Sequence, residues 1–389
     1  MAAAHRRKEP LDGLRGLAAL GVALGSWAAH TQFADARLAQ NLPLLADFVL
    51  LVAGFIVARA HRDQLAASRR VGRYLFARTG RLLPIHAACL AAFLAVDQLV
   101  ALVYGHRHGG EPSDYLATLA LVQVFVGDAE IWNAPSWIVA VELHMSYLFA
   151  ALCMTGFMAG PRGRAVVAGA VVAAIAVRMG AAGPISPAAD LLLRGGAAFL
   201  LGSLLFSFVK AEEVTRCLRR AKKRAGGLLE LWALASMGLF LALAPADLAP
   251  LAPVVFWYSL LIFVRKICSM GEALTAAPLQ RLGDLSYSII LSHALLIHPL
   301  AGLVERLGEV GPAVATVLLP VYLILAIALA EVAFRAVELP TRKAMWTWAD
   351  RAFPTAERDA RAFAGDEQDA EPDASFGRRL FARFRGANG

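Results

Sequence analysis

Five polar residues that could move protons stand inside long apolar stretches of this sequence. They are Ser26 and His30 in the first stretch, Asp47 in the second, Glu142 in the fourth and His293 in the ninth. An ionisable side chain at membrane depth is costly, so it is a candidate for function by default. Carboxylates and imidazoles can act there as general bases on a hydroxyl, which makes proton transfer the first chemistry to consider.

Each of these residues also has a structural interpretation. Ser26 follows Gly21 and Gly25, so close helix packing with the hydroxyl bonded back to the preceding turn would explain it. Glu142 is hard to place in an apolar helix without a partner on another helix, which favours function or a functional ion pair. Asp47 fits equally well as a cap or an ion pair near the interface.

The first stretch can place three polar groups along one helix. With a rise of 1.5 Å per residue, Ser26 lies roughly 16 Å beyond Arg15 along the axis, and His30 lies roughly 6 Å beyond Ser26. Ser26 and His30 are one turn apart and offset by about 40° around the helix. The two residues can therefore line one polar seam.

The composition is that of a membrane protein. Of the 389 residues, 58% are hydrophobic and 17% are charged, and the charges lie in short blocks between long apolar runs. A membrane-spanning helix needs about 20 apolar residues, and ten windows qualify. We therefore expect an all-α polytopic membrane protein. The windows are 13–31, 42–60, 82–104, 135–158, 165–184, 189–209, 227–245, 250–268, 283–303 and 311–336.

Basic residues predict the orientation. The segments "HRRK", "RAHRDQLAASRRVGRYLFARTGR", "PRGR" and "KAEEVTRCLRRAKKR" all fall on one face of the ten-helix arrangement. Lys and Arg in short loops mark the cytoplasmic side, so this face and both termini are expected to be cytoplasmic. The net charge of +8 suits an anionic inner leaflet and gives no reason to expect nucleic acid as a partner.

Two segments differ from the spans. Residues 105–134 contain an apolar stretch too short to cross, which predicts an interfacial or re-entrant element on the outer side. His106 and His108 in it offer too few ligands for a metal, and no metal site is expected. We expect a transmembrane domain over 1–343 and a cytoplasmic tail over 344–389. The tail contains the acidic linker "GDEQDAEPDAS" and then "FGRRLFARFRG", which is either an interfacial basic helix or a frayed terminus.

Seven segments, in order, resemble the integral-membrane acyltransferase-3 family over about residues 10–345. They are "LDGLRGLAAL", "ADFVLLVAGFIVA", "RYLFARTGRLLPIH", "NAPSWIVAVELHMSYL", "RGGAAFLLGSLLF", "LGDLSYSIILSHALL" and "FRAVELPTR". The resemblance implies a multi-pass enzyme of the bacterial inner (plasma) membrane. Such enzymes move an acyl group, commonly acetyl from acetyl-CoA, onto hydroxyls of surface or secreted glycans.

The resemblance also implies roles for residues. Arg15 matches the arginine of the family's first helix, while Arg78 and Arg81 match a paired-arginine motif at the cytoplasmic mouth of the third helix. Guanidinium groups suit the phosphates of CoA, so these three residues are expected to bind acyl-CoA, as a substrate and not as a permanently bound cofactor. Glu142 and His293 match further motif residues.

We expect the acceptor, a glycan or glycolipid of the cell envelope, to contact Asp47, Asn133 and Trp137. Asp47 and Trp137 belong to the second and fourth spans, which enter the membrane from the outer side, and Asn133 directly precedes the fourth. Acyl-CoA, the acceptor and the lipid bilayer are thus the expected partners.

The sequence departs from the family at the expected base. A histidine usually lies eleven residues after the first-helix arginine, and here that position is Ser26; Ala53 and Ile138 replace two other motif residues. A His30 base, one turn away, ranks above a Glu142 base, and both rank above Ser26 as a covalent nucleophile.

Two other functional classes compete with the enzyme. One is a catalytically degenerate relative that acts as a conduit or partner in glycan export or modification. The other is a secondary transporter, which would predict an internal repeat; the sequence has no detectable one. A continuous polar cavity that joins Arg78, Arg15, Ser26 and Glu142 would favour the enzyme.

Overall fold

The computed structural model describes helices and no strands over the residues that it covers, which confirms the all-α fold. The described residues are 9–66, 71–105, 110–126, 131–181, 183–210, 212–264, 269–307 and 311–353. The helices are α1 (Pro10–Ala29), α2 (Arg37–Asn41), η1 (Leu42–Leu44), α3 (Leu45–Ala66), α4 (Val71–Tyr104), α5 (Pro112–Leu119), η2 (Gln123–Phe125), α6 (Ser136–Met154), α7 (Pro161–Ala176), η3 (Val177–Ala181), α8 (Pro187–Lys210), α9 (Glu212–Leu243), η4 (Ala246–Leu251), α10 (Ala252–Phe263), α11 (Ser269–Ala273), α12 (Ala277–Ser292), α13 (Ala294–Arg306), α14 (Gly311–Ala333), η6 (Phe334–Glu338) and α15 (Leu339–Ala352).

Within the described residues, eight helices are long and apolar enough to cross a membrane, and α12 with α13 forms a ninth span if this bent pair is counted as one. Nine of the ten expected windows overlap these spans. The remaining window corresponds to α1, a 20-residue helix that is mostly buried in the bundle. The chain is therefore a multi-pass membrane protein. The eight spans are Arg37–Ala66, Val71–Val103, Ser136–Met154, Pro161–Ala181, Pro187–Lys210, Ala225–Leu243, Ala246–Phe263 and Ala313–Ala349.

Proline and glycine set several of the helix ends. Pro10, Pro112 and Pro161 each stand in the first turn of a helix, where the missing N–H leaves no internal hydrogen bond unmade. Gly180 has a φ of 94°, a left-handed conformation that glycine adopts without strain. It ends the fifth span at the turn toward α8.

Helices α1 and α12 run parallel and touch through glycines. A Cβ on Gly16 would meet the backbone at Leu282 and Gly283, and a Cβ on Gly283 would meet the carbonyl of Asp12. The hydrogen bond from Arg15 to the Gly283 carbonyl joins residues 268 apart, and the contact of Ser26 with His293 joins residues 267 apart. A nearly constant separation means that both helices advance in the same direction.

Helices α3 and α8 form a second parallel pair. The contacts of Asp47 with Arg194 and of Asp63 with Lys210 both join residues 147 apart. In a chain whose spans alternate in direction, the second and sixth spans must be parallel, and so must the first and ninth. Both pairs agree with the order of spans expected from the sequence.

The ninth span is broken and not continuous as the window 283–303 implied. Helix α12 ends at Ser292, α13 begins at Ala294, and their axes differ by 58°. The break leaves His293 at the junction, fully buried. Such a break leaves backbone groups without their helical hydrogen bonds. These groups can find new hydrogen-bond partners only inside the protein or at a cavity.

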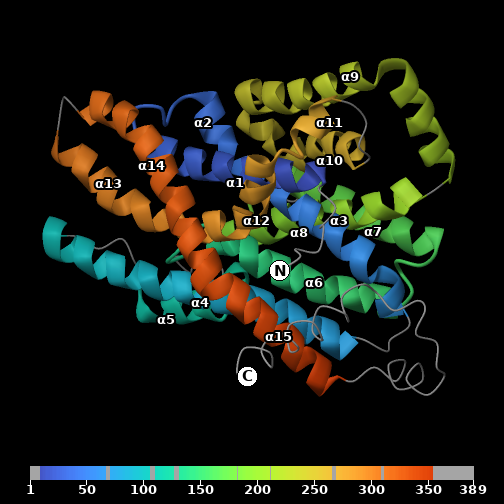
Figure 1. Cartoon of the computed structure of the whole chain (residues 1–389), viewed down its shortest axis with the longest axis horizontal. Coiled ribbons are helices and arrows are strands. Elements are labelled where there is room, and N and C mark those ends of the chain that lie inside the picture. The colour runs from blue at the N-terminus through green and yellow to red at the C-terminus, as the bar shows by residue number, and fades with distance from the viewer. Residues whose placement is uncertain are drawn as a thin grey trace, which may run out of the picture.

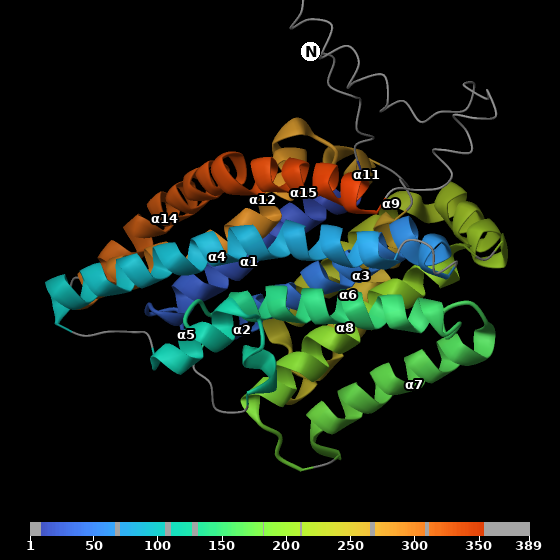
Figure 2. The same ribbon diagram turned by 90° about the horizontal axis from the view of Figure 1, so that it is seen from below.

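The third span begins earlier than expected. Helix α4 starts at Val71 and not near residue 82, so the "RTGR" motif lies inside a 34-residue helix. Figures 1 and 2 show α4 as a long helix with α6 alongside it. The early start follows from packing, because α15 covers the first turns of α4: Phe353 contacts Gly72, and Met345 contacts Gly80.

The last span continues beyond the expected end of the membrane domain. In Figure 1, α14, η6 and α15 form one long orange-to-red helix that crosses the molecule diagonally. Helix α15 ends at Ala352, so residues 344–352 continue the helix past the expected boundary at 343, while the division into domain and tail stays a prediction. Residues 354–389 of the predicted tail, the basic block at 5–8 and the pair His106 and His108 lie outside the described residues.

The segment between α4 and α6 contains no further span among its described residues. It has α5, eight residues long, and the single turn η2. Helix α5 is much shorter than the roughly 20 residues that a crossing requires. Its length agrees with an interfacial or re-entrant element.

Candidate active site

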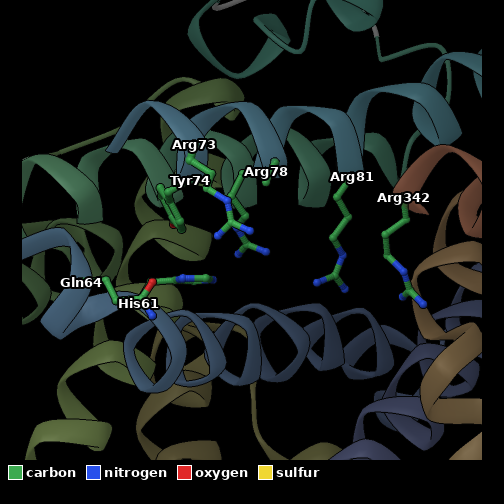
Figure 3. A pocket seen from close by; sticks show the side chains of 8 residues that line it. His61, Gln64, Arg73, Tyr74, Arg78, Arg81 and Arg342 are labelled. Carbon is green, nitrogen blue, oxygen red and sulfur yellow. The ribbon is translucent and has the colours of Figure 1, made fainter. Parts of the chain in front are cut away.

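A strongly basic pocket lies where α3 ends and α4 begins. Its volume is about 550 Å³, open solvent at its mouth included. Four arginines line it, and none of its lining residues is acidic. Figure 3 shows Arg78, Arg81 and Arg342 extending into one space from α4 and α15. Such a set of guanidinium groups suits a polyphosphate anion. The lining residues are His61, Gln64, Arg73, Tyr74, Ala77, Arg78, Arg81 and Arg342.

Arg78 joins this pocket to the interior of the bundle. Its Nη2 lies 3.4 Å from Glu142 Oε1, and its Nε donates to the Ser146 hydroxyl at 3.2 Å. The hydroxyl of Tyr74 donates to the Ser146 carbonyl, which fixes α4 against α6 at the same level. Glu142 therefore has the partner on another helix that its sequence position demanded.

Arg78 lines the pocket but is more buried than a location at the mouth of the helix implied. We expected both arginines of the motif at the mouth of the third helix, but Arg78 is only 8% exposed. The reason is that α4 begins at Val71, which carries Arg78 two turns into the helix. Its charge is compensated by Glu142, as a buried charge requires.

Arg15 does not line the pocket. Its Nη2 donates to the Gly283 carbonyl at 2.7 Å and lies 3.5 Å from Asp12. These contacts place it at the close approach of α1 and α12. In this structure Arg15 fixes the two helices in register, while its expected contact with the acyl donor stays a prediction.

A second buried acid, Glu338, packs against α12. Glu338 in η6 accepts a hydrogen bond from the Ser288 hydroxyl at 2.6 Å. The neighbouring Tyr287 is within electrostatic reach of Glu142, Glu338 and Arg81. Within the described residues, the buried Tyr287 hydroxyl has no hydrogen-bond partner. Tyr287 thus links the polar groups around the pocket to α12.

Ser26 and His293 meet across α1 and α12. Ser26 Oγ lies 3.1 Å from His293 Nε2, and His293 Nδ1 lies 2.9 Å from the Ile289 carbonyl oxygen. Ser26 Oγ also lies 3.2 Å from the carbonyl of Val22, the back-bond that its structural interpretation predicted. The sequence singled out both residues but did not pair them.

His30 stands farther out on α1. It is exposed, and its Nδ1 lies 2.9 Å from the carbonyl oxygen of Ser26. Its ring meets His298 edge to face at 6.1 Å between centroids. His30 therefore contacts the backbone of Ser26 and not its hydroxyl, and its expected role as base stays a prediction.

Asn133 lies beside the break between α12 and α13. Its side-chain amide donates to the Leu291 carbonyl at 3.0 Å. Among the described residues, Asn133 Oδ1 and Ser292 Oγ are buried and have no hydrogen-bond partner. Buried polar atoms in this state are rare and are candidates for contact with a ligand or water.

Asp47 and Trp137 come together through a residue that the sequence analysis did not single out. Arg194 Nε donates to Asp47 Oδ1 at 2.6 Å, and the Arg194 guanidinium lies over the Trp137 ring, 5.1 Å from its centroid. Arg194 also donates to the Pro43 carbonyl. Two of the three expected acceptor-binding residues thus share one cation, which packs α3, α6 and α8 together.

Several residues of the site were missed by the sequence analysis, although their segments carried signals. His61 belongs to the basic loop that predicted orientation, and Arg73 begins "RYLFARTGRLLPIH", of which only Arg78 and Arg81 were singled out. Glu338 and Arg342 belong to "FRAVELPTR", and Arg194 begins "RGGAAFLLGSLLF"; both segments served only as landmarks. Which of these charges face a common pocket depends on α15 folding back over α4.

A comparison with protein families adds an independent finding. The model of a family described as an acyltransferase domain (Acyl_transf_3) matches residues 9–331, which include α1 to α14 up to Glu331. No curated protein and no solved structure matches the chain.

Proposed function

Since the chain belongs to the Acyl_transf_3 family of acyltransferases, we propose that it moves an acyl group, most simply acetyl, from acyl-CoA to a hydroxyl of a carbohydrate or glycolipid of the cell envelope. The location in a bacterial inner membrane is part of this proposal. The donor stays on the cytoplasmic side, and the acceptor is met deeper in the bundle or beyond it.

The basic pocket is the observation that carries the proposal. Arg73, Arg78, Arg81 and Arg342 surround a space with no acidic side chain in its lining. CoA carries a pyrophosphate and a further phosphate, and such groups bind guanidinium forks through paired charge-assisted hydrogen bonds. We assign the CoA phosphates to this pocket.

Proton transfer in this proposal belongs to His293. The imidazole is fully buried, and its Nε2 faces Ser26 at the position where the family carries its histidine. A base within hydrogen-bond reach of a reacting hydroxyl contributes about 10²–10⁴-fold to the rate. His30 and Glu142 are the competing bases, but His30 is exposed and Glu142 is paired with Arg78.

We infer that the donor extends along α12 between the two parts of the site. Tyr287 is within electrostatic reach of Arg81, and His293 follows six residues later, roughly 9 Å along the helix axis. In this proposal, CoA bound through its phosphates in the pocket extends its acyl group toward Ser26 and His293. Asn133 and Ser292, with their unpartnered oxygens, are the groups that we assign to the acceptor, and Asp47 and Trp137 are assigned to it farther from the pocket.

The proposal is tested by transfer of labelled acetyl groups. Membranes that contain the chain are supplied with radiolabelled acetyl-CoA, and surface polysaccharide and lipid fractions are analysed by mass spectrometry. Acetyl esters that appear only with the chain support the proposal. Binding of CoA without any transfer would instead support the degenerate relative, which keeps the pocket and has lost the reaction.

A further inference from the structure

The contact between His293 Nδ1 and the Ile289 carbonyl fixes the position of the proton on the imidazole. The Ile289 carbonyl beside His293 Nδ1 can only accept a hydrogen bond, so Nδ1 carries the proton. In a neutral imidazole Nε2 then has a lone pair and no hydrogen. The hydroxyl of Ser26 lies 3.1 Å from Nε2 and can turn its one hydrogen from the Val22 carbonyl to this lone pair.

The same atoms also accommodate the charged form of the imidazole. If Nε2 gains a proton, it donates to Ser26 Oγ, and the serine can turn its own hydrogen to the Val22 carbonyl at 3.2 Å. Both protonation states are thus hydrogen-bonded without movement of either helix. A serine whose hydroxyl donates to a base, with that base oriented by a third group, is the arrangement of an activated nucleophile.

The bundle holds this pair firmly in place. Ser26 lies ten residues beyond Gly16 on α1, and His293 lies ten residues beyond Gly283 on α12, so each is roughly 15 Å along its helix from the contact of the two glycines. The glycines let the backbones touch there. Equal distances along two parallel helices bring the hydroxyl and the imidazole to the same depth.

We propose that Ser26 is a covalent acyl carrier, with His293 as its base; the inference rests on the proposed function and specifies its mechanism. Ser26 Oγ attacks the thioester carbonyl of acyl-CoA while its proton passes to His293 Nε2. The carbon–sulfur bond breaks, and the CoA sulfur leaves as a thiol with that proton. The product is an acyl ester on Ser26.

The second half of the reaction restores the enzyme. The acceptor hydroxyl gives its proton to His293 Nε2, and its oxygen attacks the carbonyl of the Ser26 ester. The bond between that carbonyl and Oγ breaks, and Oγ takes the proton back from Nε2. Each half conserves protons and electrons, and each uses only acyl-CoA and the acceptor.

This mechanism predicts a reaction that needs no acceptor. A covalent carrier releases free CoA before the acceptor binds, so purified protein should exchange labelled CoA into unlabelled acetyl-CoA. Rapid acid quench followed by peptide mass spectrometry should find one acetyl group on Ser26. Both signals should fall to background in Ser26→Ala, and exchange should fall about 10²–10⁴-fold in His293→Gln.

Two further variants keep the test decisive. Ser203→Ala removes a buried helical serine that bonds only its own helix at Leu200, and it should leave exchange unchanged. Ser26→Cys keeps a nucleophile and should yield a thioester at the same position, cleavable by neutral hydroxylamine. Tryptophan fluorescence and size-exclusion profiles equal to those of the parent chain establish that each variant is folded.

The outcomes separate this inference from the proposed function. Acetyl transfer to an acceptor without CoA exchange and without modified Ser26 overturns the carrier and leaves the acyltransferase intact. Exchange that persists in folded Ser26→Ala also overturns it. The absence of both transfer and exchange in the parent chain overturns the proposed function together with the carrier.

Discussion

Arg78 Nη2 lies 3.4 Å from Glu142 Oε1, and this ion pair joins α4 to α6 inside the membrane domain. The two side chains are 9% and 8% exposed, so water can do little to stabilise either charge once its partner is removed. Glu142 is therefore explained first as the counter-charge of Arg78, and a part in proton transfer would have to be compatible with that pairing.

Glu142→Gln should destabilise the protein. The change leaves the Arg78 charge buried without its partner, which typically costs about 3–5 kcal/mol. Glu331→Gln is the matched control, because Glu331 pairs with Arg281 and Arg335 near the surface and should cost about 0–1 kcal/mol. Thermal unfolding in detergent compares the two. A Glu142→Gln protein of parental stability that has lost transfer would instead identify Glu142 as the base.

Arg81→Gln and Arg342→Gln should weaken CoA binding. A hydrogen bond to a charged group is worth about 1.5–3 kcal/mol, which corresponds to roughly a 10- to 150-fold increase in Kd for each variant. Titration of the purified protein with CoA measures this increase in Kd. Arg164→Gln removes an exposed arginine outside the pocket that bonds the Ala159 carbonyl, and its Kd should stay at the parental value. Unchanged affinity in the Arg81/Arg342 double variant would remove the donor from this pocket.

His293→Gln should abolish transfer, whereas His30→Ala should reduce it only slightly. His293 contacts Ser26 Oγ, while His30 is exposed and contacts the carbonyl of Ser26 but not its hydroxyl. A radiolabelled acetyl transfer assay compares the two. The reverse result, with His30→Ala inactive and partly rescued by Ser26→His, would make His30 the base that the sequence first suggested.

Gly16→Ala should separate Ser26 from His293. A methyl group at Gly16 would meet the backbone of α12 at Leu282, and overpacking of this kind costs about 1–3 kcal/mol. Gly169→Ala on α7 is the control, since no atom lies within 4 Å of its added Cβ and alanine stabilises a helix by roughly 0.5–1 kcal/mol over glycine. Transfer and thermal stability should both fall for Gly16→Ala. If both variants behave alike, the close approach of α1 and α12 is not required.

Reporter fusions should determine the orientation. A reporter active only in the periplasm should give signal near residues 110, 185, 247 and 306 and none near 70, 220 and 275, because the basic loops mark the cytoplasmic face. Signal at residue 220 would overturn the order of spans. The parallel pairs α1 with α12 and α3 with α8 additionally require the two spans of each pair to run in the same direction.

The sequence by itself determined the class of the protein and most of its spans. Apolar length alone identifies a membrane helix, because an unpaired backbone in lipid costs too much for any other local structure. Because an ionisable side chain is also costly in lipid, Glu142, Asp47 and His293 stood out as functional candidates. Ordered segments such as "RTGR" and "LSYSIILSH" were enough to suggest the family that the comparison then supported.

Only the tertiary structure decided which polar groups meet. A periodic pattern fixes the face of one helix but not the neighbour that covers it, so Arg194 beside Asp47, Arg342 in the pocket and His293 beside Ser26 could not be predicted from the sequence. The break at His293 was equally hidden, because the apolar run continues through it. These contacts depend on where two helices approach closely, and at Gly16 and Gly283 that is set by the absence of a single Cβ on each side.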